Sequence, residues 1–136
     1  MSAVAREVAE KEFESWMDFK KIPAKKRESN KEYGEKIIEA ICDGRLILNE
    51  EDHTFTQKLF FPIQEEGGST AVSTLNFKPR VKTETIHIQM NGVKPGDADR
   101  RVLAYVAALT GVPKALIAKL DTEDYDVCQS FSVFFL

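Results

Sequence analysis

The stretch that decides the fold is residues 97–136, DADRRVLAYVAALTGVPKALIAKLDTEDYDVCQSFSVFFL. The residues that can begin or end a helix in this stretch predict three consecutive helices. Asp97 can cap the first helix by accepting hydrogen bonds from free backbone N–H groups, and Gly111 can end it in the left-handed conformation. Pro113 suits the first turn of the second helix, where no backbone N–H is needed. Asp121 stands where it can cap the third helix.

Four acidic residues at the start of the third helix allow two interpretations: Asp121, Glu123, Asp124 and Asp126. A carboxylate cluster can bind a cation, but no glycine stands where a calcium loop of the EF-hand type needs one. Acidic side chains also stabilise the positive end of a helix, and Asp124 follows Asp121 at the spacing of a capping arrangement. Capping is therefore the favoured interpretation, and we expect no metal site.

Apolar residues recur at three- and four-residue steps along all three helices. On the third helix they form a wide stripe that ends in Phe134, Phe135 and Leu136. A chain end of this composition needs a covering surface, which either the same molecule or a partner can supply. Packing into the protein's own core is the simpler explanation, an exposed binding face is the alternative, and one helix can do both.

The order of cap, turn and apolar residues over residues 57–136 carries a family resemblance. The segment KLFFPIQEEGGSTAVSTLNFKPR places Pro-Ile after a strand, then a Gly-rich turn, then a strand that ends in a basic residue. Further along the chain come Leu109-Thr110-Gly111, Leu116 with Leu120, Asp124-Tyr125 and Phe135-Leu136. Together these features resemble the small tail assembly chaperones of contractile-tailed bacteriophages. Residues 1–56 have no counterpart in the typical short members of that family.

The composition is that of an ordinary globular domain. The chain has 136 residues, of which 43% are hydrophobic and 30% charged, so it is long enough for one core. Its net charge of −3 provides no field that attracts nucleic acid. Cys42 and Cys128 lie far apart and are expected to be reduced thiols. Neither a signal peptide nor an apolar run of membrane-spanning length is apparent, so we expect no membrane contact and a cytoplasmic location.

Residues 2–20 predict an amphipathic helix with a large aromatic face that includes Phe13, Trp16 and Met17. Such a helix either packs across the body of the protein or is offered to a partner. Packing is favoured, and partner binding stays open.

A basic segment follows, which holds Lys20, Lys21, Lys25, Lys26 and Arg27 and has no acidic residue until Glu28. Pro23 disfavours a helical conformation at Ile22, so a solvated linker is the simplest interpretation of this segment. The alternative is an electrostatic contact with an acidic partner or a phosphate. We accordingly divide the chain into an N-terminal helix and linker, residues 1–28, and an α+β region, residues 29–136, within one globular domain overall.

The middle of the chain predicts a helix and then strands. Ser29 with Glu32 has the spacing of a capping box for a helix that Gly44 ends, and Gly34 within it suggests a close helix crossing. Alternating residues then predict a hairpin, in which Phe61 shares the inner face with Phe55. Further strands are predicted over residues 72–77 and 83–90, with a turn at residues 67–69. The fold class is therefore α+β: N-terminal helices, a small, mostly antiparallel sheet of hairpins, and a C-terminal three-helix segment.

The sequence offers no motif for catalysis, cofactor binding or metal binding. His53 and His87 lack further ligands at metal spacing, and His87 is expected on the polar side of a strand. Tyr125 is expected to pack its ring and expose its hydroxyl. The protein is therefore predicted to be non-enzymatic and to need no cofactor.

Function is predicted from the resemblance, which implies a chaperone in tail morphogenesis, encoded by a phage or prophage. Its clients would be the tape measure protein and the tail tube protein, bound in the host cytoplasm, and it would be absent from the mature virion. Two alternatives stay open: a structural tail or baseplate subunit, and a phage-encoded inhibitor of a host protein. The oligomeric state is not predicted. The apolar side chains assigned to the client surface are Phe13, Trp16, Met17, Phe131, Phe134, Phe135 and Leu136.

Overall fold

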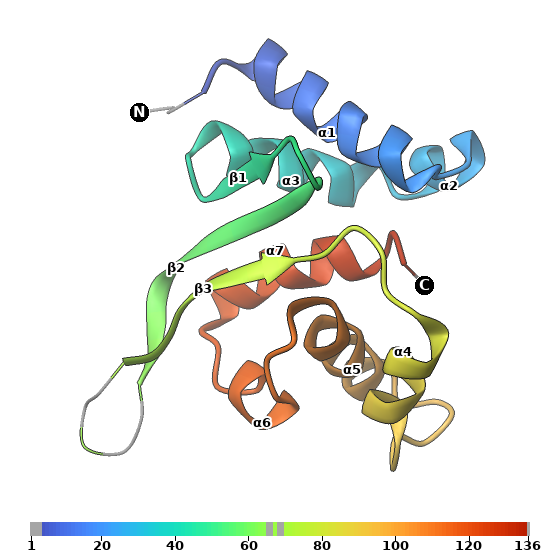
Figure 1. Cartoon of the computed structure of the whole chain (residues 1–136), viewed down its shortest axis with the longest axis vertical. Helices are drawn as coiled ribbons and strands as arrows, with labels where there is room; N and C mark the ends of the chain where they lie inside the picture. The colour runs from blue at the N-terminus through green and yellow to red at the C-terminus, as the bar shows by residue number, and fades with distance from the viewer. Residues whose placement is uncertain (1–3, 65–66, 68–69, 136) are drawn as a thin grey trace.

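The computed structural model describes residues 4–64, 67 and 70–135, and the predicted α+β class is confirmed there (Figure 1). This part of the chain holds seven helices and one three-stranded antiparallel sheet. Of the predicted turn at residues 67–69, residues 68 and 69 lie outside the described residues. The elements are α1 (Arg6–Lys20), α2 (Ala24–Ser29), α3 (Lys31–Cys42), β1 (Leu46–Asn49), β2 (Thr54–Gln64), β3 (Thr70–Phe77), α4 (Thr83–Met90), α5 (Ala98–Thr110), α6 (Lys114–Ile117) and α7 (Thr122–Ser132).

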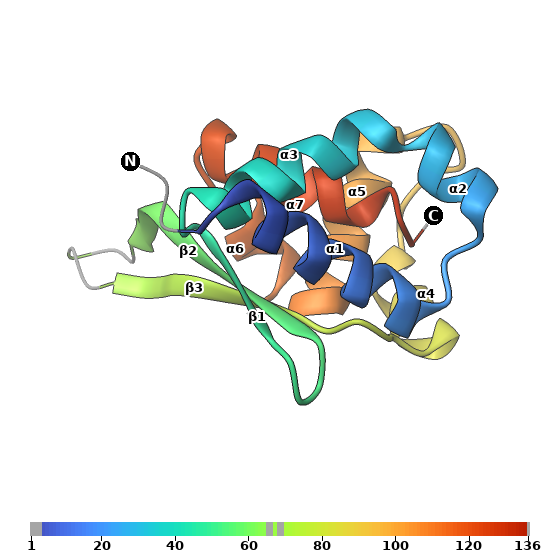
Figure 2. The same cartoon turned by 90° about the horizontal axis from the view of Figure 1, so that it is seen from above.

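Helix α7 occupies the middle of the molecule. It packs against α3 on one side and α5 on the other, and it also contacts β2. In Figure 1, α1 and α3 lie together at one end, α4, α5 and α6 lie at the other, and the sheet runs beside α7. The view from above shows α1 crossing the same region as α7, with β2 and β3 along one side (Figure 2). The C-terminal helix is thus enclosed by elements from both halves of the chain.

The sheet has the order β1-β2-β3, and the predicted hairpin between β1 and β2 is confirmed. Leu46 pairs with Gln57, and Phe55 pairs with Phe77 on the third strand. Alternate residues of β1 are buried, as the period of two requires when one face of a sheet covers a core. The expectation that Phe61 continues this inner face is wrong, because its side chain is 56% exposed.

Trp16 is the centre of an aromatic core and is fully buried. Its ring lies 5.5 Å from that of Phe131, 6.0 Å from that of Phe134 and 5.8 Å from that of Phe55, measured between centroids. Helix α1 therefore shares one core with the sheet and α7. The predicted division at residue 28 stays a prediction.

Gly34 lies where α1 crosses α3, which confirms the predicted close approach. A Cβ atom built on Gly34 would come within 3.0 Å of Cε2 of Phe13. The predicted capping box at the start of this helix is wrong. Ser29 ends α2, and Asn30, which precedes α3, makes no side-chain capping hydrogen bond. The linker interpretation is corrected as well, because residues 24–29 form a short helix that begins directly after Pro23.

Residues 83–90 form a helix, α4, so the predicted strand is wrong. The alternation of Ile86 and Ile88 suggested a strand, but the segment packs against α5 as a helix. Lys114 of α6 donates a hydrogen bond of 2.6 Å to the carbonyl oxygen of Gln89, which satisfies a free carbonyl in the last turn. Contacts from distant residues therefore override a weak local preference for strand.

The punctuation predicted for the C-terminal helices is confirmed. The Asp97 carboxylate accepts a hydrogen bond of 3.2 Å from the backbone N–H of Arg100, and Gly111 ends α5 with φ of 74°. Pro113 immediately precedes α6, and Asp121 caps α7 by accepting from the backbone N–H of Glu123. No helix in the described part of the chain is both long and apolar enough to cross a membrane.

Candidate partner-binding site

The side chains predicted to bind a client lie mostly in the core. Phe13 and Phe134 are 5% and 2% exposed, and Trp16 and Phe131 are fully buried. The favoured interpretation, packing into the protein's own core, is therefore confirmed for these four, which cover one another across α1 and α7. The alternative of an exposed face is wrong for them. The other three are Met17 and Phe135, which are half-buried, and Leu136, which lies outside the described residues. Binding of a client by this group stays a prediction.

Two other aromatic side chains are exposed side by side on β2. Phe60 is 54% exposed and Phe61 is 56% exposed. Neighbouring residues of a regular strand point to opposite faces, so one of the two would normally be buried here. The strand is irregular at this point. From Lys58 to Ile63 it advances five positions, whereas its partner moves only two, from Thr74 to Val72. The bulge turns both phenylalanine side chains outward.

The carboxylate of Asp124 holds the bulge in place. One oxygen accepts a hydrogen bond of 2.9 Å from the backbone N–H of Phe60, and the other accepts one of 3.0 Å from Phe61. Bulging removes both N–H groups from the ladder with β3, and the carboxylate replaces the lost acceptors. Both carboxylate oxygens of the fully buried Asp124 are engaged by β2, so its predicted role in capping α7 is wrong.

Arg45 compensates the buried charge. A guanidinium nitrogen lies 3.7 Å from the Asp124 carboxylate and donates a hydrogen bond of 3.2 Å to the backbone oxygen of Glu123. The guanidinium carbon also lies 3.9 Å from the centre of the Phe60 ring. A buried carboxylate is tolerated only where such partners satisfy it. The same contact fixes the orientation of the Phe60 ring.

Gln57 and Cys128 add further polar contacts next to Asp124. The amide of Gln57 donates a hydrogen bond of 3.0 Å to the backbone oxygen of Asp124, and the Cys128 thiol donates one of 3.4 Å to the Gln57 side-chain oxygen. Burial, assisted by the negative charge of Asp124, raises the pKa of the Cys128 thiol, so it stays protonated and can donate. Gln57 is fully buried, and its polar atoms are paired. These paired groups make the local structure rigid. The buried Nε of Arg45 has no hydrogen-bond partner among the described residues.

The result is a rigid base that presents two adjacent aromatic rings to solvent. Aromatic side chains are enriched at protein–protein interfaces, because they give a large contact area at low entropic cost. Sequence reasoning missed both residues as site candidates. The available signal was Pro62, which cannot donate to the ladder and marks a place where regular pairing stops.

The predicted electrostatic contact residues do not act as one patch. Arg27 pairs with Asp18 at 2.9 Å, and Lys20 donates to the backbone oxygen of Pro79. Lys21 and Lys25 are exposed, and Lys26 is half-buried. Only part of the basic segment is thus available to a partner.

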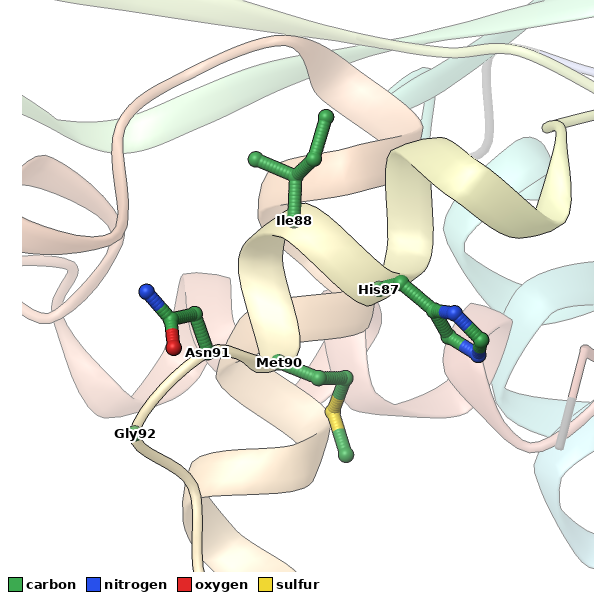
Figure 3. A pocket seen from close by; sticks show the side chains of 5 residues that line it. All are labelled: His87, Ile88, Met90, Asn91 and Gly92. Carbon is green, nitrogen blue, oxygen red and sulfur yellow. The ribbon is translucent and has the colours of Figure 1, made fainter.

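The side chains around the hollow at the end of α4 do not form a catalytic or metal-binding cluster among the described residues. Figure 3 shows His87, Ile88 and Met90 pointing in different directions around a hollow at the end of α4. The expectation that His87 lies on the polar side of a strand is wrong, because His87 is an exposed residue of helix α4. Burial, assisted by Cys128 and Asp99, raises the pKa of Tyr125 to about 12, so its phenol stays protonated at neutral pH. The described residues contain no group of three His, Cys, Asp or Glu side chains able to hold a metal ion.

Comparison with known proteins identifies the family. The family model described as "Phage tail assembly chaperone proteins, E, or 41 or 14" matches residues 56–136, more than half of the 136-residue chain. No curated protein and no solved structure matches the chain. The matched segment contains Phe60, Phe61 and Asp124, whereas Arg45 and α1 precede it. The chain belongs to the family of phage tail assembly chaperones.

Proposed function

We propose that this chaperone binds apolar segments of the tape measure protein, the tail tube protein or both, with Phe60 and Phe61 as anchors. Family membership supports the chaperone role. The observation that carries the choice of site is the simultaneous exposure of two adjacent phenylalanines, at 54% and 56%, on a strand whose other aromatic side chain, Phe55, is buried. A polar network that includes a buried carboxylate maintains this exposure.

The physical task explains why such a surface is useful. A tape measure protein is long and coiled-coil-like, and it exposes an apolar stripe before the tail tube assembles around it. An exposed stripe of that kind leads to aggregation. A chaperone that covers the stripe through a few aromatic contacts buries a small area, so binding is weak enough for tube subunits to displace it.

The proposal includes a non-enzymatic role in the host cytoplasm during assembly. A chaperone is released before the particle is finished, whereas a structural subunit remains in it. Mass spectrometry of purified virions separates the two roles. Absence of the chain from virions agrees with the proposal, and its presence at stoichiometric amounts would favour a structural subunit.

Co-expression with a tape measure fragment tests the proposed site. The wild-type chain is expected to keep the fragment in the soluble fraction, and the Phe60→Ser/Phe61→Ser variant is expected to lose this effect. Ile88→Ser is the matched control, because Ile88 is 72% exposed on α4, outside the proposed site. An unchanged client solubility in the presence and absence of the wild-type chain would contradict the chaperone proposal. Equal activity of the double variant would contradict the assignment of the site.

A further inference from the structure

A groove lies between α2, the first turn of α3 and the end of α7. Its volume is about 690 Å³. Pro23, Tyr33 and Val133 supply apolar surface, and Lys25 and Lys26 supply two positive charges. Within the described part of the chain no acidic residue lines it; Glu28 belongs to α2 but is not part of the lining. The groove therefore combines apolar walls with a single sign of charge.

Its two lysines are not neutralised from within the described part of the chain. No ion pair involves Lys25 or Lys26, whereas Arg27, the next residue, pairs with Asp18 at 2.9 Å and donates to the backbone oxygen of Ile22. The positive charge of Lys26, after burial, is also one of the causes that lower the pKa of Lys20 to about 8. The local excess of positive charge therefore lowers the pKa of a neighbouring lysine.

The walls of the groove belong to the packed body of the protein. The side chain of Asn30 donates a hydrogen bond of 3.5 Å to the backbone oxygen of Val133, which joins the start of α3 to the end of α7. Tyr33 packs against the core, and the Nζ atom of Lys36 lies 5.9 Å from the centre of its ring. Because both sides are anchored, the groove is present before any ligand arrives, and this reduces the entropic cost of binding.

We infer that this groove binds an acidic peptide segment that carries a bulky apolar residue, presented by a partner protein. The apolar residue would lie against Pro23, Tyr33 and Val133, and its flanking carboxylates would face Lys25 and Lys26. Charge complementarity selects this occupant, because the described lining residues include two cations and no anion. The inference goes beyond the proposed chaperone site, since the groove does not include Phe60 or Phe61 and most of it precedes residue 56, where the family match begins.

A peptide fits the groove better than a nucleic acid does. Single-stranded nucleic acid is held by successive aromatic side chains, and Tyr33 is the one aromatic residue among the described lining residues. An extended apolar wall beside two point charges suits an apolar side chain with neighbouring carboxylates.

Fluorescence anisotropy on the full chain tests the inference. The probe is a labelled ten-residue peptide of Glu and Asp around a central Leu-Phe pair, and the comparison peptide replaces the acids by Gln. The acidic peptide is expected to bind, and raising NaCl from about 50 mM to about 500 mM is expected to weaken binding about tenfold. Failure of the acidic peptide to bind at the lower salt, or equal binding of the Gln peptide, would overturn the inference.

Charge reversal locates the contact. Lys25→Glu/Lys26→Glu is expected to weaken acidic-peptide binding about tenfold or more. Lys94→Glu/Lys119→Glu changes the net charge equally at two exposed lysines outside the groove and is expected to leave binding within about twofold. Equal loss in both variants would show a nonspecific charge effect and overturn the inference. Tighter binding of an oligothymidylate of matched charge would do the same and assign the groove to nucleic acid.

The outcome is separable from that of the proposed function. Lys25→Glu/Lys26→Glu is expected to keep the tape measure fragment soluble in co-expression, because Phe60 and Phe61 are unchanged. The Phe60→Ser/Phe61→Ser variant is expected to bind the acidic peptide normally. Either proposal can therefore fail without the other.

Discussion

The ammonium group of Lys20, at the end of α1, lies 3.4 Å from the centre of the Phe135 ring, two positions beyond the C-cap of α7. The same nitrogen donates a hydrogen bond of 2.8 Å to the backbone oxygen of Pro79. One side chain thus connects α1, the segment after β3 and the end of the chain. Cation–π contacts of this kind stabilise most when they are partly shielded from water.

Lys20 gives the stability of the protein an unusual pH dependence. Burial, with the charges of Lys26 and Arg80, lowers the pKa of Lys20 from 10.5 to about 8 in the folded state. Between these two pH values the unfolded chain binds more protons at this residue, so the stability contributed by Lys20 rises with pH and is lost as pH falls. Partial exposure limits the effect to about 1 kcal/mol. Urea unfolding at pH 7.5 to 10.5, compared with Lys20→Met, measures it as the difference between the two proteins.

The comparison with Lys20→Met is needed because other groups act in the opposite direction. Burial raises the pKa of Cys128 above its ordinary value of 9.0, so its contribution to stability falls as pH rises past that value. This term is common to both proteins and cancels in the difference. A constant difference in unfolding free energy across the range would contradict the account of Lys20.

Any side chain at position 34 is expected to reduce the stability of the fold. Alanine raises helix propensity by about 1 kcal/mol, but its Cβ atom would lie 3.0 Å from Cε2 of Phe13. The Phe13 ring is stacked on Trp16 and meets Phe134 edge-on, so it has little room to move. We expect Gly34→Ala to destabilise the fold by about 1 kcal/mol and Gly34→Val by about 3 kcal/mol. Denaturant unfolding of both variants measures these losses.

A second substitution checks the cause. Gly34→Ala combined with Phe13→Leu is expected to be more stable than the sum of the two single losses predicts, because the smaller side chain relieves the contact. Strict additivity would mean that the loss at Gly34 has another origin.

Asp124→Asn is expected to destabilise the fold by about 2–4 kcal/mol, because an amide can accept only one of the two N–H bonds and leaves Arg45 without its anion. Asp126→Asn, on the same helix, removes only an exposed pair with Lys36 at 3.1 Å and is expected to cost less than about 0.5 kcal/mol. Thermal or urea unfolding of the two variants provides the comparison. Equal losses would show that the Asp124 carboxylate does not hold the bulge.

Local chemistry was enough to predict the C-terminal helices. Asp97, Gly111 and Asp121 each act through backbone groups within a few residues, so their positions in the sequence determine their roles. Apolar periodicity likewise predicted α1 and the hairpin of β1 and β2. These residues act on their own neighbours, which makes them predictable from sequence. The equally local capping box predicted from Ser29 and Glu32 is nevertheless wrong.

Long-range contacts account for the failures at α4 and at Asp124. Helix α4 depends on packing against α5 and on Lys114, which lies more than twenty positions from Gln89, the residue it caps. Asp124 has the spacing of a capping residue, yet its partners are Phe60 and Phe61 on β2. No local pattern distinguishes these roles.

The aromatic residues illustrate the same limit for function. Amphipathic stripes at Trp16 and Phe131 predict an apolar face but not what covers it, and here they cover each other. The exposed phenylalanines instead lie on a strand that was expected to place one of them inside. Only the bulge, which depends on Asp124, explains their exposure.

Phe60 and Phe61 are proposed to anchor a client protein. The direct measurement is calorimetric titration of a purified tape measure fragment into the wild-type chain, Phe60→Ser/Phe61→Ser and the exposed control Ile88→Ser. The account predicts that the double variant stays folded and loses affinity about tenfold or more, while the control binds within about twofold of wild type. Equal affinity of all three proteins for the fragment would contradict it.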